Sequence, residues 1–177
     1  MSGDGLTHLD AEGRAHMVDV GAKEVTLREC VARAELHLAP ETLARLLDGR
    51  MPKGDVLATA RIAGIQAAKR TADWIPLAHP LPLESVAVEF APAPAPGADG
   101  RARLGVEVRV RAHARTGVEM EALVAASAAG LTVYDMCKAV DRGMTLEGIR
   151  LVRKRGGRSG PWERPGEPER LAGASDP

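Results

Sequence analysis

An acid and an amine stand three residues apart near the end of a long apolar stretch. Asp135 follows residues 131–134, and Lys138 comes one helical turn later, so the two side chains share a face of any helix that forms there. A carboxylate beside an ammonium group can donate protons, accept them, or both. The same spacing also describes an ordinary surface ion pair, and spacing alone favours that simpler interpretation.

Two further segments place polar groups where they could act on a ligand. Lys53-Gly54-Asp55 precedes a predicted helix, and free amides at a helix amino terminus favour an anion, although most such triplets are simple loops. His79 lies within residues 75–82, where three prolines predict a rigid extended loop. Such a histidine is either structural or catalytic, and the structural role is the commoner one.

Basic residues are scattered over predicted loops and helix ends, which suits a polyanionic substrate such as a nucleotide. A glycine-rich basic segment, residues 153–160, either wraps anionic oxygens or is a solvated end. No phosphate-binding loop of the Gly-x-x-x-x-Gly-Lys-Ser/Thr type and no metal-ligand cluster occurs in the sequence, so we expect no metal. The scattered basic residues are Lys23, Lys53, Lys69, Arg70, Lys138, Lys154 and Arg158.

The composition limits the class of protein. Of 177 residues, 45% are hydrophobic but only 2% aromatic, so a core of Ala, Val, Leu and Ile is expected. The 24 acidic and 24 basic residues cancel, which argues against a general nucleic-acid coat. No signal peptide or membrane-spanning apolar run is found, and Cys30 and Cys137 have no metal-like spacing. We therefore expect a cytoplasmic protein without membrane or nucleic-acid partners.

Periodicity predicts one α+β domain. Strands are expected at residues 26–38, 83–90, 101–112 and 144–154, and helices at 40–47, 56–73 and 118–140. This order indicates a ferredoxin-like antiparallel sheet with helices packed on one face. The predicted organisation is a flexible amino terminus at 1–14, a single catalytic domain at 15–160 and a disordered tail at 161–177.

The long helix also constrains where a site can lie. Thr116 and Glu119 have the spacing of a capping box, which places the helix start. Glu121 and Asp135 lie 14 residues apart, roughly 21 Å along a helix. One small ligand is not expected to bridge that distance, so if both ends are functional, either the ligand is long or different subunits complete each site.

Five segments resemble the MoaC family, the cyclic pyranopterin monophosphate synthases of molybdenum cofactor biosynthesis. They are residues 16–20, 53–71, 75–81, 116–123 and 131–140, including Lys-Gly-Asp at 53–55 and Tyr-Asp-Met-Cys-Lys at 134–138. The likeness runs in register from about residue 6 to residue 160.

The resemblance implies a lyase of the phosphorus–oxygen class. Its substrate would be (8S)-3′,8-cyclo-7,8-dihydroguanosine 5′-triphosphate, made from GTP by a preceding radical enzyme. Its products would be cyclic pyranopterin monophosphate and pyrophosphate. The family needs no cofactor for this reaction and forms homohexamers, arranged as trimers of dimers, with active sites at the dimer interface.

The resemblance also assigns roles. Asp135, Lys138 and Lys53 match the family's catalytic residues, and the substrate-contacting segments match Leu77, Ala78, His79, Met120 and Glu121. Less specific candidates, for contacts with the triphosphate, are Lys23, Arg28, Lys69, Lys154 and Arg158.

Some positions depart from the family pattern. Met51 and Pro52 stand where histidines often precede the lysine, and Ala78 replaces a frequent cysteine. Neither an imidazole nor a thiol is therefore expected to act at those positions. Arg155 and Arg158 alter the basic segment but keep its charge.

Overall fold

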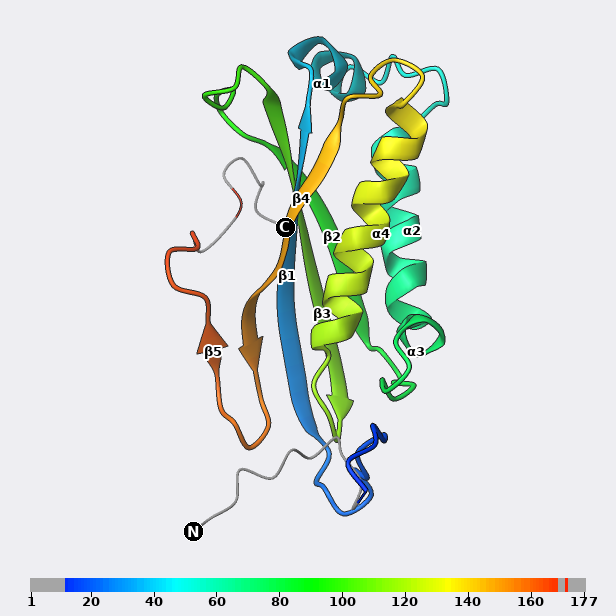
Figure 1. Ribbon diagram of the computed structural model, residues 1–177, viewed down its shortest axis with the longest axis vertical. Coiled ribbons are helices and arrows are strands. Elements are labelled where there is room, and N and C mark those ends of the chain that lie inside the picture. The colour runs from blue at the N-terminus through cyan, green and yellow to red at the C-terminus, as the bar shows by residue number, and fades with distance from the viewer. Residues whose placement is uncertain (1–11, 169–170, 172–177) are drawn as a thin grey trace.

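The computed structural model describes residues 12–168 and residue 171 (Figure 1). Within them the strands are β1 (Thr26–Leu38), β2 (Ser85–Pro92), β3 (Ala102–Ala114), β4 (Thr145–Arg155) and β5 (Trp162–Glu163). The helices are α1 (Pro40–Leu47), α2 (Val56–Lys69), α3 (Thr71–Trp74) and α4 (Glu119–Cys137). In this part of the chain, no helix is long and apolar enough to cross a membrane.

The described strands form one antiparallel sheet in the order β2-β3-β1-β4-β5. The first four reproduce the ferredoxin-like arrangement, in which the first and third strands of the chain lie at the centre and the second and fourth lie outside them. The helices lie on one side of the sheet, with α2 beside α4 (Figure 1). The predicted α+β class and the one-sided packing are confirmed.

Strand alternation explains which face is covered. Along β1 the even-numbered residues from Cys30 to Leu38 are buried against the helices, and along β3 the even-numbered residues from Ala102 to Ala114 do the same. The core consists mainly of Ala, Val and Leu, as the composition predicts. We call the opposite side of the sheet the open face.

Small residues let α2 and α4 approach each other and the sheet closely. A Cβ added at Gly64 would lie 3.2 Å from the carbonyl oxygen of Ala125, and one added at Gly130 would lie 2.5 Å from a methyl carbon of Leu146. A side chain at Gly64 would press on the backbone of α4, and one at Gly130 would displace the Leu146 side chain. The long helix α4 is therefore fixed against its neighbours along its length.

Two local predictions about helices were wrong. The helix expected at 56–73 is interrupted at Arg70, whose ψ of 17° departs from helical geometry, and α3 follows as a separate turn. The capping box at Thr116 does not form, because Val118 is the N-cap of α4 and no side chain caps it. The Glu119 carboxylate instead accepts a hydrogen bond from Lys154 Nζ at 3.2 Å, which competes with backbone capping.

The tail from residue 161 was expected to be disordered, but part of it has a defined place. Residues 161–168, which we call the strap, include β5 and cross the open face of the sheet. The Arg164 amide donates to Val152 O at 2.8 Å, and Glu167 accepts from Arg33 Nη1 at 3.0 Å. Residues 169–170 and 172–177, and residues 1–11 of the predicted flexible amino terminus, lie outside the described residues.

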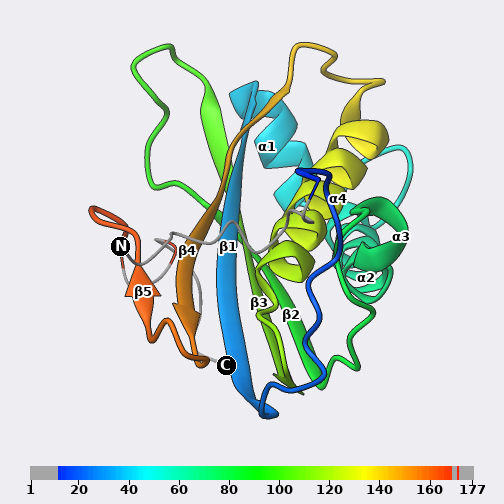
Figure 2. The same ribbon diagram turned by 60° about the horizontal axis from the view of Figure 1, so that its bottom comes forward.

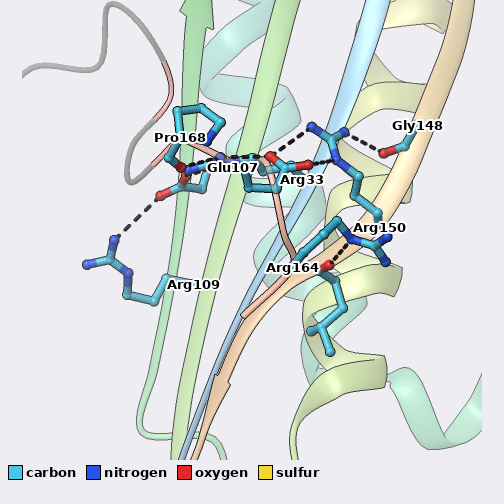
Figure 3. A network of polar contacts seen from close by, with 9 residues as sticks. Arg33, Glu107, Arg109, Gly148, Arg150, Arg164 and Pro168 are labelled. Atoms are coloured by element: carbon cyan, nitrogen blue, oxygen red, sulfur yellow. Dashed lines mark hydrogen bonds and ion pairs between the residues drawn. The ribbon is translucent and has the colours of Figure 1, made fainter. Parts of the chain in front are cut away.

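Buried charge explains why the strap is held. Arg33, whose exposed fraction is 1%, donates from Nε and Nη2 to Glu107 Oε2 at 2.8 and 2.7 Å (Figure 3). Arg150 binds both carboxylate oxygens of Glu167. The strap thus brings a second carboxylate to the buried guanidinium of Arg33, and a buried charge is tolerated only when it is paired in this way.

Glu107→Ala is expected to lower the free energy of unfolding by about 3–5 kcal/mol, because it leaves the buried Arg33 without its closest carboxylate. The matched control is Glu89→Ala, since Glu89 is the exposed cross-strand neighbour of Glu107 on β2. That variant should stay within about 0.5 kcal/mol of the parent. Denaturant titrations measure both, and equal stability of the two variants would contradict the account.

Candidate active site

Lys53, Asp135 and Lys138 meet at the carboxyl-terminal end of α4. Lys53 Nζ donates to Asp135 Oδ2 at 2.8 Å and to the Asp135 carbonyl at 3.0 Å, and Lys138 Nζ lies 2.7 Å from Asp135 Oδ1. All three side chains are about half exposed. We call this group the lysine–aspartate cluster.

Local structure before α2 positions Lys53. The Asp55 carboxylate caps α2 by accepting from the Ala58 amide at 2.9 Å, and Gly54 has a φ of +85°, which favours glycine. This sharp entry into the helix places Lys53 beside the end of α4. At the predicted anion seat, the Asp55 carboxylate takes a free helix amide, and the Lys53 ammonium is paired with Asp135.

The two ammonium groups set the charge of the cluster. Hydrogen bonds from Lys138 and then Lys53 lower the pKa of Asp135 to about 2, and Asp135 in turn raises the pKa of Lys138. At neutral pH Asp135 is therefore a carboxylate and Lys138 an ammonium group. In this arrangement the lysines carry the protons that can be donated, and Asp135 orients them.

A pocket of about 470 Å³ lies at the opposite end of α4, and we call it the α4 N-terminal pocket. The segment before β1 runs on the helix side of the sheet and contributes its wall (Figure 2). His79 Nε2 lies 2.9 Å from the carbonyl oxygen of Val18 and donates to it, which leaves Nδ1 for a second partner. All five predicted substrate-binding residues line this pocket: Leu77, Ala78, His79, Met120 and Glu121.

Glu121 is the titratable group in this pocket with the most altered acidity. Its side chain is buried, with an exposed fraction of 4%, and burial followed by the nearby charge of Glu119 raises its pKa to about 7. A carboxyl group with a pKa near neutrality can both give and take a proton under physiological conditions. Glu121 is thus equipped for proton transfer as well as for hydrogen bonding.

Glu121→Gln is expected to remove a pH dependence of stability. Because the folded-state pKa of Glu121 lies above its usual value of 4.5, its stabilising contribution is full below pH 4.5 and is lost as the pH rises through 7. The shift corresponds to at most about 3 kcal/mol between these limits. Unfolding free energies of parent and variant at pH 5 and pH 8 test this, and a constant difference between them would contradict it.

A second, more basic pocket of about 850 Å³ adjoins the first. Lys23, Thr116, Gly117 and Glu119 line both, so the two form one continuous hollow. We call the second part the basic pocket, and guanidinium and ammonium groups there suit an anion with several oxygens. Its cationic side chains are Lys23, Arg28, Arg115, Lys154 and Arg158.

The structure does not bring all predicted site residues together within one chain. The lysine–aspartate cluster shares no lining residue with the hollow at the other end of α4. Lys69 lies apart from the basic pocket and lines a smaller pocket of about 270 Å³ beside His79 and Glu121. The separation of Glu121 and Asp135 expected from helix geometry thus holds, because α4 runs unbroken between them.

Some lining residues were not anticipated from the chemistry of the sequence. Val18 and Val20 line the α4 N-terminal pocket, and the only signal for them is that residues 16–20 form one of the family-like segments. Arg115 lines the basic pocket, where its Nε donates to the Lys23 carbonyl at 3.0 Å. No motif marks this arginine, because only the fold places the end of β3 beside Lys23.

The fold is a ferredoxin-like α+β fold, and its continuous hollow joins a pocket lined by His79 and Glu121 to a pocket lined by basic residues. Comparison with known proteins makes the class specific. The chain belongs to the MoaC family, whose pattern matches residues 17–157.

Similar proteins cover almost the whole chain. A cyclic pyranopterin monophosphate synthase of Chloroflexus aurantiacus is 61% identical over 160 residues, covering 90% of this chain and 95% of its own length. One from a Roseiflexus species is 63% identical over 155 residues, covering 88% and 95%. A synthase of the same name from Pelotomaculum thermopropionicum is 55% identical over 163 residues, covering 92% and 93%.

Proposed function

We infer that this protein is a lyase of molybdenum cofactor biosynthesis that forms cyclic pyranopterin monophosphate. The substrate is (8S)-3′,8-cyclo-7,8-dihydroguanosine 5′-triphosphate, and pyrophosphate is released. The observation that carries this inference is the identity of 61–63% to synthases of that name over about nine tenths of the chain. The protein acts in the cytoplasm, in keeping with the reducing compartment that its two unpaired cysteines favour.

The continuous hollow fits the two halves of this substrate. The α4 N-terminal pocket takes the purine-derived ring and the sugar, with hydrogen bonds from His79 and Glu121. The basic pocket takes the triphosphate, because Arg28, Lys154 and Arg158 offer charge-assisted hydrogen bonds to phosphate oxygens. Its volume of about 850 Å³ accommodates a triphosphate chain.

The lysine–aspartate cluster supplies the catalytic groups. Lys138 and Lys53 donate protons during ring opening and closure, and Asp135 holds both ammonium groups in position through its two oxygens. The lysines also offset negative charge that develops as pyrophosphate leaves. Glu121, with a pKa near 7, exchanges protons with the ring at the other side of the substrate.

A second subunit is required to bring the two halves of the site together. Met120 and Leu131 are exposed on α4, with exposed fractions of 36% and 53%, and Ser127 and Ala128 between them are small. A twofold axis passing near Ala128 would pair two α4 helices antiparallel, so that the cluster of one chain faces the hollow of the other. We propose this dimer as the unit of a homohexamer arranged as a trimer of dimers.

Turnover of the purified substrate tests the inference. The full chain should consume the cyclic triphosphate and release one pyrophosphate for each pterin formed, as followed by mass spectrometry. Stoichiometric binding without any turnover would instead indicate a nucleotide-binding module.

A further inference from the structure

The basic residues at the end of β4 point to both faces of the sheet. Lys154 lies on the helix side, where it bonds Glu119 and lines the basic pocket. Because successive side chains of a strand point to opposite faces, Arg153 and Arg155 lie on the open face. The run Arg153-Lys154-Arg155 therefore divides its charge between two separate surfaces.

A cavity of about 320 Å³ lies on the open face, between β4 and the strap. Arg153 and Arg155 from β4 and Arg164 from the strap line it, together with Glu163 and Glu167. We call it the strap cavity, and it shares none of its lining residues with the basic pocket.

Hydrogen-bond donors in the strap cavity are incompletely used. Arg153 is largely buried, its Nε has no hydrogen-bond partner among the described residues, and its Nη2 lies 3.9 Å from Glu29 Oε1, beyond hydrogen-bonding distance. Arg155 Nη2 likewise lies 3.9 Å from Glu163 Oε1. A largely buried guanidinium donor normally has a partner, so Arg153 Nε is available to an acceptor in the cavity, and the exposed Arg155 can reach the same acceptor.

Within residues 12–168, the other charged groups that line the cavity are engaged elsewhere or exposed. Arg164 is anchored, with Nε donating to Leu151 O at 2.8 Å and its guanidinium 5.6 Å from the centre of the Trp162 ring. Of the two carboxylates in the wall, Glu167 is bound by Arg150 and Arg33, and Glu163 is mostly exposed. Three arginines thus line the cavity, and one of its two carboxylates, that of Glu167, is already paired with Arg33 and Arg150.

We propose that the strap cavity binds a phosphate oxyanion, either inorganic phosphate or pyrophosphate. Planar guanidinium groups match the oxygens of phosphate with paired hydrogen bonds, and the cavity has room for either ion. This site is distinct from the proposed triphosphate contacts, because it lies on the other face of β4. Since the strap supplies Arg164 and one wall, bound anion also ties the strap to the sheet.

Fluorescence of Trp162 reports binding, because its ring stacks on the guanidinium of Arg164. The protein has two tryptophans, so Trp74→Phe leaves Trp162 as the sole tryptophan. Titration of this full-length variant with pyrophosphate and, separately, with phosphate should give a saturable change in emission. The ion with the lower dissociation constant is the preferred oxyanion.

Arg155→Gln, added to that background, should weaken the fluorescence response at least tenfold while leaving substrate turnover within twofold. Arg155 is exposed, so the variant is expected to fold, and Arg153→Gln provides a second test at the more buried position. Arg158→Gln, in the basic pocket, is the matched control and should leave the Trp162 response unchanged.

Three results would overturn the proposal. One is the absence of a saturable response to either ion, and another is an unchanged response in Arg155→Gln. A third is a change of oligomeric state in Arg155→Gln, seen by sedimentation velocity, with unaltered anion binding. That outcome would mean that these arginines face a neighbouring subunit.

Discussion

Asp135→Asn is expected to reduce turnover of the cyclic triphosphate by about a thousandfold or more, in line with the loss of a group that positions catalytic proton donors. The amide keeps the shape of the side chain but cannot hold two ammonium groups by charge. Lys53 and Lys138 would lose their shared partner, which now lies 2.8 and 2.7 Å from their Nζ atoms. Steady-state release of pyrophosphate measures the effect.

Folding should be little changed in Asp135→Asn, because the side chain is about half exposed. Asp99→Asn is the matched control, since Asp99 is also exposed and has a lowered pKa, held by the Arg101 amide and the charge of Arg103 in the β2–β3 turn. The control should keep full turnover and the same assembly. Normal turnover in Asp135→Asn would remove the central catalytic assignment.

Mixing two inactive variants is expected to restore activity. In Asp135→Ala every chain lacks the carboxylate of the cluster, and in Glu121→Ala every chain lacks the acid of the α4 N-terminal pocket. If one site takes its cluster from one chain and its pocket from the other, a mixed dimer has one intact site and one doubly altered site. A refolded equal mixture should then show about a quarter of parental turnover, as random pairing around a twofold axis requires.

The control for this complementation is a pair of variants from the same half of the site. Asp135→Ala mixed with Lys138→Ala should remain inactive, because each mixed site lacks one or the other cluster residue. Recovery in this control, or no recovery in the first mixture, would contradict a site shared between subunits.

The fold could be predicted from the sequence because its signals are local. Alternating apolar residues in β3 mark the face that meets the helices, and these even-numbered residues are indeed buried, whereas in β1 the apolar residues stand at both odd and even positions and leave the register ambiguous. The start of α4 could not be predicted in the same way. Glu119, assigned to a capping box, is drawn away by Lys154, which is 35 positions distant in sequence.

The ordered path of the strap was not predicted for a related reason. Residues 161–168 are rich in proline, glycine and charge, a composition typical of disorder. What holds them is the buried Arg33 together with the partly exposed Arg150, and both reach Glu167 only once the sheet has formed. Charged residues at the open face of a strand normally indicate solvent, so no local pattern distinguishes these arginines.

The candidate site was predictable in its residue types but not in its electrostatics. Spacing places Asp135 and Lys138 on one face, and family-like segments select Lys53 and His79. Asp135 is exposed and hydrogen bonds from its lysine partners lower its pKa, whereas burial raises the pKa of Glu121. Solvent exposure depends on the packing at the two ends of α4, which the helix sequence alone does not specify.

The structure of the Asp135→Asn oligomer with the cyclic triphosphate bound tests the shared site most directly. The account predicts a ligand whose ring contacts His79 and Glu121 of one subunit and whose reacting atoms lie within hydrogen-bonding reach of Lys53 and Lys138 of a neighbour. A ligand enclosed by a single subunit, with every lysine–aspartate cluster open to solvent, would contradict it.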